Sequence, residues 1–218
     1  MAKVDLGEQI LGSNQRIAEK NRELFDSQGL VTINLMSGPG AGKTSLLERT
    51  VSLLRDEMKI GIIEGDLQTT QDADRVRAAG ARAVQIETEG ACHLDARMIA
   101  RELEQFPLDE IDLLVIENVG NLVCPAAFEL GEHARVMMLS VTEGDDKPSK
   151  YPTMFHKANV VLVNKTDLLP YVDYSLERVE KDVHRLKPDA TVLAISCKTD
   201  EGMDRWLDWI KEQVRKNG

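Results

Sequence analysis

The sequence predicts an α/β fold with a mostly parallel, seven-stranded sheet and helices on both of its faces. Seven short runs rich in branched aliphatic residues begin near positions 31, 60, 83, 112, 136, 159 and 191. Segments with helical spacing of apolar residues separate these runs, and a glycine-rich turn joins the first run to the helix behind it. Strands that alternate with helices are typical of a parallel sheet buried on both faces.

Local patterns give the individual elements. Nearly continuous apolar runs predict buried strands, and apolar residues three and four positions apart predict helices. After the first strand and its helix, the expected strands are residues 60–66, 82–88, 111–117, 135–141, 159–163 and 191–196. Further helices are expected from Leu94 onward, over 151–158 and from Met203 to Val214, whereas residues 143–152 indicate a charged loop.

Length and composition exclude several classes of protein. The 218 residues suit one α/β domain, and the net charge of −10 argues against binding to nucleic acid or to an anionic membrane surface. The N-terminus lacks the apolar core of a secretory signal, and no apolar stretch is long enough to span a membrane, so we expect a cytoplasmic location. Three cysteines, an odd and small number, argue against a disulfide framework.

The stretch from Val31 to Thr50 has the order strand, glycine-rich loop and helix that a phosphate-binding loop requires. Lys43 would reach the β- and γ-phosphates, and the Thr44 hydroxyl would ligate Mg²⁺. One departure is Ser37, which stands where the strict pattern has glycine, and a glycine-rich turn without a ligand is the alternative. The expected phosphate-binding residues are Gly38, Pro39, Gly40, Ala41, Gly42, Lys43, Thr44 and Ser45.

Two carboxylates follow buried strands at the edge of the sheet where such folds bind ligands. Asp66 is expected to contact Mg²⁺ or to orient the attacking water, with an N-cap for the segment 68–79 as the alternative, and residues 67–74 would sense the nucleotide. Glu117 would ligate Mg²⁺ through water, and the Gly120 amide could contact the γ-phosphate. Lys43, Asp66 and Glu117 are therefore the candidate catalytic residues.

The tetrapeptide 164–167, Asn-Lys-Thr-Asp, directly follows a buried strand and points to a guanine nucleotide. The Asp167 carboxylate can accept hydrogen bonds from guanine N1–H and the 2-amino group, which adenine cannot supply. Asn164 and Lys165 would brace this loop and cover the base. The loop of Ser196, Cys197 and Lys198 would back the base, and Cys197 is expected to be a small loop residue rather than a metal ligand.

Cys92, His93 and Cys124 are ligand types that suit Ni²⁺ or Zn²⁺. Three residues do not complete a tetrahedral site, so water or a second copy of the chain would have to contribute. Taken singly, each residue could instead be structural, because a lone cysteine is usually buried.

The nucleotide motifs divide the chain into an N-terminal helical extension, residues 1–28, and a single nucleotide-binding domain, residues 29–218, which carries the metal candidates. Helical spacing over residues 5–28 predicts a leading helix that packs on the domain or on a second subunit, and a frayed tail is the alternative.

Several longer runs resemble the HypB family, the nickel-inserting GTPases of hydrogenase maturation, and more distantly UreG of urease maturation. These runs are EGDLQTTQDADRV, GACHLDARM, ENVGNLVCPAAFELGE, SVTEGDDKPSKYPTMF and NKTDLLPY. The resemblance implies a P-loop GTPase of the SIMIBI class that forms a homodimer when nucleotide binds. It would deliver nickel to a [NiFe]-hydrogenase large-subunit precursor together with HypA.

The resemblance also assigns the family's metal ligands to Cys92, His93 and Cys124, at a dimer interface where Cys124 could bridge two ions. Lys147 or Lys150 could reach across that interface. Residues 1–30 contain neither cysteine nor histidine, so the N-terminal nickel motif and the histidine-rich tract of some family members are absent from this stretch.

These observations favour a switch in which GTP and Mg²⁺ order Asp66 and residues 117–120, reposition Cys124 and close the dimer. Turnover should be slow without a partner because no arginine finger is evident. Three alternatives remain at this point: a metal-independent regulatory GTPase, a small-molecule kinase on the same scaffold, and a non-catalytic metal-binding module.

Overall fold

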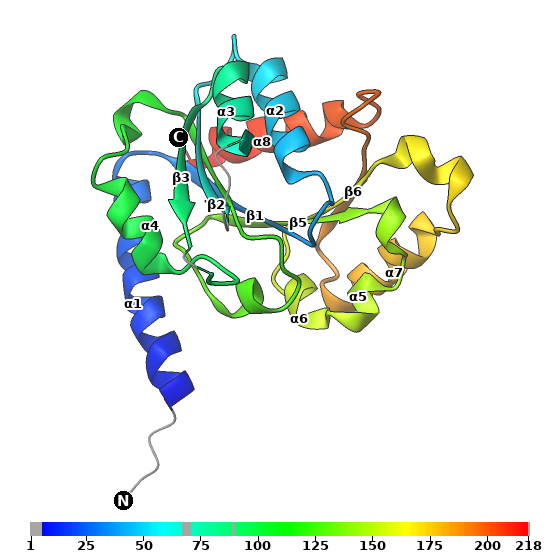
Figure 1. Ribbon diagram of the computed structural model, residues 1–218, viewed down its shortest axis with the longest axis horizontal. Helices are drawn as coiled ribbons and strands as arrows, with labels where there is room; N and C mark the ends of the chain where they lie inside the picture. Colours follow the sequence, from blue (N-terminus) through cyan, green and yellow to red (C-terminus); the bar gives the residue numbers. More distant parts are fainter. Residues whose placement is uncertain (1–5, 67–70, 89, 218) are drawn as a thin grey trace, which may run out of the picture.

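A single parallel sheet of seven strands organises the computed structural model (Figure 1), which describes residues 6–66, 71–88 and 90–217. The predicted fold class is confirmed, and every predicted strand is present, with ends shifted by at most two residues. The strands are β1 (Val31–Ser37), β2 (Ile60–Asp66), β3 (Arg82–Glu87), β4 (Leu113–Glu117), β5 (Ala134–Ser140), β6 (Val160–Asn164) and β7 (Thr191–Ala194).

The strand order β3-β2-β4-β1-β5-β6-β7 places β1 at the centre of the sheet, paired in parallel with β4 and β5. The chain leaves β1 toward β2 on one side of the sheet and returns later to build the other side from β5 onward. In open parallel sheets, ligands bind at the carboxyl ends of the strands where the order reverses in this way. The loops after β1, β4 and β5 therefore surround one crevice.

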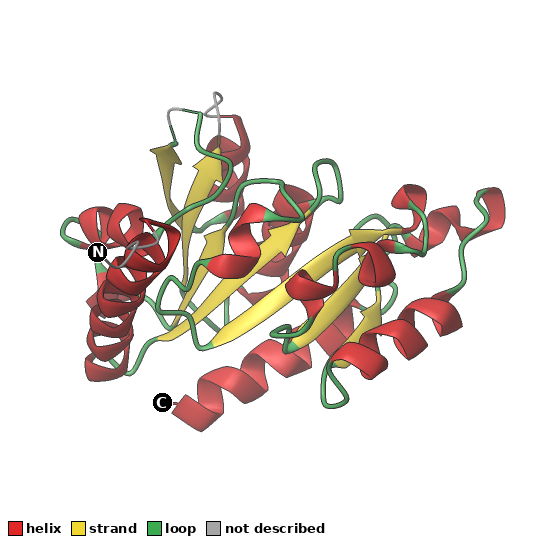
Figure 2. Cartoon of the chain, turned by 90° about the horizontal axis from the view of Figure 1, so that it is seen from below, coloured by secondary structure: helices red, strands yellow, loops and turns green. Residues whose placement is uncertain are grey.

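Helices cover both faces of the sheet (Figure 2). One core cluster packs α2, α3 and α8 against β1, and two others pack α1 and α4, or α6 and α7, against the opposite face. No helix within the described ranges is long and apolar enough to cross a membrane. The helices are α1 (Leu6–Ser27), α2 (Lys43–Leu54), α3 (Gln71–Ala79), α4 (Ala96–Leu103), α5 (Lys147–Lys150), α6 (Pro152–Phe155), α7 (Leu176–Leu186) and α8 (Met203–Asn217).

The predicted leading helix is present as α1, and the frayed-tail alternative is wrong. Phe25 is fully buried in the core, and His133 fixes the end of the helix to the sheet. The His133 Nδ1 accepts from the Thr32 N–H at 2.9 Å, and its Nε2 lies 2.9 Å from an Asp26 carboxylate oxygen. Ile10, nearer the start of α1, is exposed. The first part of α1 extends beyond the sheet in Figure 1.

Three local predictions need correction. Part of the expected sensing loop is helical, since α3 begins at Gln71, while residues 67–70 lie outside the described residues. The expected charged loop contains the helical turn α5, because Pro148 near its start already has a helical φ and lacks only an N–H that a first turn does not need. No element was assigned to residues 176–186, which form α7 with Ser175 accepting from the Arg178 N–H as its N-cap.

Candidate nucleotide and metal site

The loop between β1 and α2 has the backbone shape of a phosphate cradle. Gly40 and Gly42 adopt φ of 75° and 104°, the left-handed region that favours glycine. A Cβ on Gly42 would lie 2.6 Å from the Asn164 Nδ2, so a larger residue would both strain the backbone and displace the neighbouring loop. The first residue of α2 is Lys43, and the helix N-terminus faces the cradle.

Ser37, the departure from the strict pattern, contributes a hydroxyl to this site. Its Oγ accepts from the Lys43 Nζ at 3.1 Å and donates to the Gly38 carbonyl at 2.6 Å. The Lys43 Nζ also lies 3.9 Å from a Glu117 carboxylate oxygen. The lysine is thus held at the floor of the crevice.

A cleft of about 510 Å³ lies above this lysine. Gly120 belongs to the same wall, since a Cβ there would lie 3.1 Å from the Pro39 Cα. Residues 117–120 therefore run directly beside the phosphate loop, as expected for a segment that senses the terminal phosphate. The cleft is lined by Pro39, Gly40, Gly42, Lys43, Thr44, Ser45, Glu64, Gly65, Asp72, Arg75, Glu117, Asn118, Val119, Gly120 and Lys165.

Two charged residues in this cleft were missed by the sequence analysis. Glu64 is buried on β2 in register with Glu117 on β4, so two carboxylates stand side by side in the cleft. Arg75 on α3 also lines the cleft and donates to the Glu48 carboxylate at 2.6 Å. The backbone of Asp66 ends β2 beside them, while its side chain lies outside the part that the structure describes.

A second cavity of about 430 Å³ adjoins the first and shares Gly42, Ser45 and Lys165 with it. Asp167 lines this cavity and accepts from the Ser196 hydroxyl at 2.7 Å. The remaining lining residues are Asn164, Leu168, Cys197 and Lys198. The structure thus brings together the residues predicted to bind phosphate and the residues predicted to bind the base.

Side-chain bonds tie the base loop to the phosphate loop. The Asn164 Nδ2 donates to the Ala41 carbonyl at 3.0 Å, and its Oδ1 accepts from the Cys197 N–H at 3.3 Å. The Lys165 Nζ donates to the Gly40 carbonyl at 2.8 Å. Burial raises the pKa of the Cys197 thiol to about 11, which keeps it protonated and suits the loop role expected for it.

Cys92, His93 and Cys124 come together at one point although 32 positions separate the two cysteines. Their ligand atoms all lie within 4.8 Å of one another, with the two sulfurs 2.8 Å apart and the Cys92 Sγ 3.6 Å from the His93 Nδ1. Cys92 and His93 lie in the loop before α4, and Cys124 begins the short 3-10 helix η2 (Cys124–Ala127).

The surroundings of this cluster shift the pKa values of the Cys92 thiol and the His93 imidazole in opposite directions. The hydrogen bond to Cys124, together with burial, raises the pKa of the Cys92 thiol. Burial lowers the pKa of His93, so its imidazole is neutral at pH 7 and keeps a lone pair for coordination. Binding of a divalent ion would release thiol protons, which makes metal affinity dependent on pH.

The cluster is also close to the nucleotide cleft along the chain. Cys124 follows Gly120 by four residues, and the Asn121 Oδ1 accepts from the N–H groups of Val123 and Cys124 at 2.7 and 3.2 Å. This turn makes residues 120–124 a compact unit. A candidate metal ligand and a residue that touches the phosphate loop therefore lie at opposite ends of one short segment.

The nucleotide-binding domain model of the CobW/HypB/UreG family matches residues 31–194. The hydrogenase maturation factor HypB of Azotobacter chroococcum is 51% identical over 210 residues, which cover 96% of this chain and 69% of that protein. A crystal structure of HypB from Archaeoglobus fulgidus matches with a TM-score of 0.88 at 43% identity, covering 93% of this chain and 99% of that one.

The chain belongs to the HypB family of hydrogenase maturation factors. A further HypB relative, from Helicobacter pylori, was crystallised in complex with nickel, and it matches with a TM-score of 0.90 at 40% identity over 94% of this chain and 96% of that one. The resemblance expected from the sequence is thereby confirmed.

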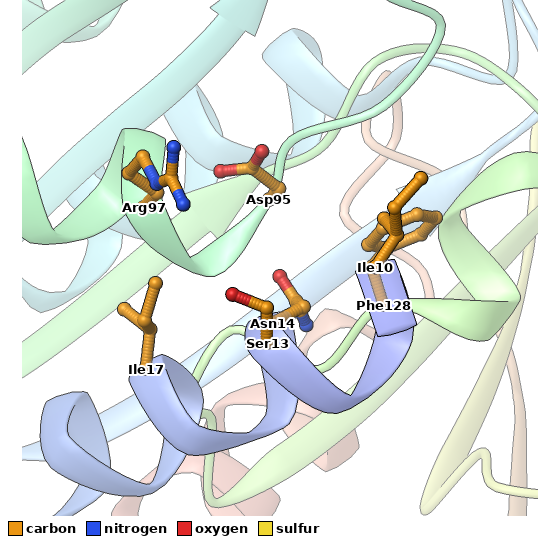
Figure 3. A pocket seen from close by; sticks show the side chains of 7 residues that line it. All are labelled: Ile10, Ser13, Asn14, Ile17, Asp95, Arg97 and Phe128. Carbon is orange, nitrogen blue, oxygen red and sulfur yellow. The ribbon is translucent and has the colours of Figure 1, made fainter. Parts of the chain in front are cut away.

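A pocket of about 250 Å³ adjoins the Cys92–His93–Cys124 cluster of this HypB-family chain (Figure 3). It lies between α1 and the start of α4, and Asn14, Asp95 and Phe128 are among the residues that line it. The Phe128 ring stands 3.9 Å from the His93 ring, centroid to centroid. Phe128 therefore joins the pocket to the candidate metal ligand His93, a contact that no sequence motif indicated.

Proposed function

We propose that this protein hydrolyses GTP and uses the nucleotide cycle to bind and deliver nickel during [NiFe]-hydrogenase maturation. The observation that carries this proposal is the segment 120–124, which joins a residue packed on the phosphate loop to a cysteine of the metal cluster. Membership of a family of hydrogenase maturation factors and the nickel complex of a relative support it.

The proposed nucleotide is GTP because the second cavity presents the Asp167 carboxylate where a base would lie. Lys43 is proposed to hold the β- and γ-phosphates, and the glycine cradle to supply backbone N–H donors. The Thr44 hydroxyl and the carboxylates of Asp66 and Glu117 are oxygen donors of the kind Mg²⁺ prefers, and this ion would neutralise phosphate charge.

Nickel is the proposed cargo, held by Cys92, His93 and Cys124, and the same ligands also accept zinc. When GTP draws residues 117–120 toward the phosphates, Cys124 moves relative to Cys92 and His93. We propose that this state is a homodimer in which Cys124 bridges two ions and Lys147 or Lys150 reaches across the interface. Hydrolysis then lowers nickel affinity and releases the ion to a HypA-type partner and the hydrogenase large-subunit precursor, in the cytoplasm.

Titration of Ni²⁺ into the protein tests this proposal. Wild type is expected to bind Ni²⁺ with different affinity in the presence of a non-hydrolysable GTP analogue and of GDP, and Cys124→Ala is expected to lose this binding. If wild type and Cys124→Ala bind alike, or neither binds, the metal-independent regulatory switch becomes the better account. Hydrolysis that Lys43→Ala abolishes would exclude a purely metal-binding module, and transfer of phosphate to an acceptor would instead indicate a kinase.

A further inference from the structure

A buried asparagine connects the nucleotide-sensing segment to the metal loop. Asn118 follows Glu117 directly and is fully buried. Its Oδ1 accepts from the Leu94 N–H at 3.1 Å and from the Val119 N–H at 3.0 Å. Leu94 is the residue next to His93, so one side chain spans the gap between the loop that flanks the phosphates and the loop that carries two metal ligands.

The Asn118 Nδ2 begins a chain of hydrogen bonds toward the second metal-bearing segment, residues 124–128. The Asn118 Nδ2 donates to the Asn34 Oδ1 at 3.3 Å, and the Asn34 Nδ2 donates to the Glu132 Oε1 at 3.2 Å. Glu132 also accepts from the Arg135 Nε at 2.6 Å. Asn34 lies in β1, Asn118 directly follows β4, Glu132 lies in the turn before β5 and Arg135 lies in β5, and all four are buried.

Arg135 completes the connection. Its two terminal nitrogens donate to the carbonyls of Ala126 and Phe128, each at 3.1 Å. Ala126 lies in η2 two residues after Cys124, and Phe128 packs its ring on His93. Both metal-bearing segments are therefore attached to one polar network, and Asn118 is the member that belongs to the nucleotide-sensing segment.

We propose that Asn118 is the positioning residue through which the nucleotide state is transmitted to the Cys92–His93–Cys124 cluster. This inference rests on the proposed function and names the residue that carries its coupling. If residues 117–120 shift toward the phosphates, Asn118 either draws the Leu94 N–H with it or leaves that buried donor unpaired. Because an unpaired buried donor costs free energy, the metal loop follows the nucleotide segment.

A matched control stands on the opposite side of the same loop. The Asn14 Oδ1, on α1, accepts from the Ala96 N–H at 2.8 Å, and its Nδ2 donates to the Glu129 carbonyl at 2.8 Å. Asn14 thus makes two bonds of the same kind to the segments just beyond the metal ligands. It is attached to α1 and has no bond to residues 117–120 among those recorded for the described residues, so it should support the loop without transmitting the nucleotide state.

The experiment compares wild type, Asn118→Ala and Asn14→Ala in the full chain. For each, the dissociation constant for Ni²⁺ is measured with a non-hydrolysable GTP analogue and with GDP. Coupling between two sites typically changes affinity by 5- to 150-fold. We therefore expect the ratio of the dissociation constant with GDP to that with the GTP analogue to be on the order of 10 in wild type and in Asn14→Ala. In Asn118→Ala we expect the ratio to fall within about twofold of unity while Ni²⁺ still binds.

The outcomes separate the two proposals. A wild-type ratio above unity that persists in Asn118→Ala overturns the role of Asn118 and leaves the proposed function standing. A wild-type ratio of unity overturns the proposed function, and the role of Asn118 falls with it. If Asn14→Ala loses the ratio as well, general loosening of the loop explains the effect and the specific role of Asn118 is wrong.

A measurement on wild type covers the case in which Asn118→Ala does not fold. Amide hydrogen exchange of Leu94 and Ala96 is compared in the GTP-analogue and GDP states without metal. Exchange of the Leu94 amide should change with the nucleotide, whereas the Ala96 amide, which Asn14 holds, should not. Identical Leu94 exchange in both states would contradict the proposal.

Discussion

The two halves of the crevice are built differently. On the base side, the loops after β1, β6 and β7 are tied directly to one another through Asn164, Lys165 and Ser196. On the metal side, the loops after β3 and β4 meet mainly through the buried network of Asn34, Asn118, Glu132 and Arg135. The loops of the base side are bonded to one another, whereas the two loops of the metal side are both bonded to a buried polar network.

Because of this difference, we expect the base side and the metal side to have different roles. A base pocket whose walls already hold one another has little conformational entropy to lose on binding, which favours selection of one nucleotide. The Cys92–His93–Cys124 cluster is attached to residues 117–120 through a few buried bonds, so its geometry would change if those residues moved. Selectivity for the nucleotide should therefore depend on the base side, and coupling between nucleotide and nickel binding should depend on the metal side.

The largest effect is expected at Asp167. Asp167→Asn removes the proposed acceptor for guanine N1–H and the 2-amino group, so preference for GTP over ATP should fall by roughly 10⁴-fold. Xanthosine triphosphate, whose 2-carbonyl can accept from the new amide, should bind the variant better than GTP. Competition binding with the three nucleotides checks this, and Cys92→Ala, which leaves the base pocket unchanged, is the control. Retained GTP preference in Asp167→Asn would place the base elsewhere.

Arg135 should dominate the stability of the metal side. Arg135→Ala leaves Glu132 as an uncompensated buried charge and frees two carbonyls, so the free energy of unfolding should drop by about 3–5 kcal/mol. The exposed Arg178 forms an ion pair with Asp145 at 2.8 Å. Arg178→Ala removes this pair and should lower the free energy of unfolding by less than about 1 kcal/mol. Urea unfolding of both variants measures the difference, and equal losses would show that the buried network is not a framework.

Metal binding should separate from hydrolysis at Cys124. Because loss of even a supporting group costs 10- to 100-fold in metal affinity, Cys124→Ala should weaken Ni²⁺ binding by at least about 100-fold. Basal GTP hydrolysis without nickel should be nearly unchanged. Cys197→Ala serves as control, since its thiol lies in the base pocket and should leave the Ni²⁺ affinity alone. Equal loss of Ni²⁺ binding in both cysteine variants would contradict the assignment of nickel binding to the metal side.

The smallest effect concerns the link between α1 and the sheet. The His133 Nδ1 accepts from the Thr32 N–H, and burial lowers the pKa of this histidine below its ordinary value of about 6.5. The unfolded chain therefore binds more protons between the two pKa values, so the stability from neutral His133 is complete above about pH 6.5 and is lost as pH falls toward the folded pKa. Unfolding curves from pH 7.5 to 5 should fall more steeply for wild type than for His133→Gln, and parallel curves would contradict this.

Elements whose determinants are contiguous could be predicted from the sequence. The phosphate loop and the base loop are each one short run between a strand and the next element, so spacing alone predicts what their residues do, and these roles stay predictions. The seven strands could be predicted for a similar reason, because each contains a short local run rich in branched aliphatic residues. Residue types alone marked Cys92, His93 and Cys124 as candidate ligands, but spacing could not show that they meet, and the resemblance to a family strengthened the assignment.

The residues that the sequence analysis missed owe their place in the site to neighbours that are distant in the chain. Glu64 looks like an isolated acid in an apolar strand until pairing of β2 with β4 sets it beside Glu117. Arg75 enters the cleft only because α3 packs along α2. Asn34 and Asn118 are single polar residues in or after apolar strands, and a buried polar residue in such a run is the signal that could have marked them. Their partners follow from the strand order, which the sequence analysis did not derive.

Release of nickel during a single round of hydrolysis tests the central claim most directly. The protein is loaded with Ni²⁺ and GTP, mixed rapidly with excess magnesium and a coloured nickel chelator, and followed for both phosphate and nickel. The account predicts that nickel reaches the chelator with the rate constant of phosphate production, and that a non-hydrolysable analogue holds it back. Nickel that leaves at one rate whether GTP is hydrolysed, replaced by the analogue or replaced by GDP would contradict the account.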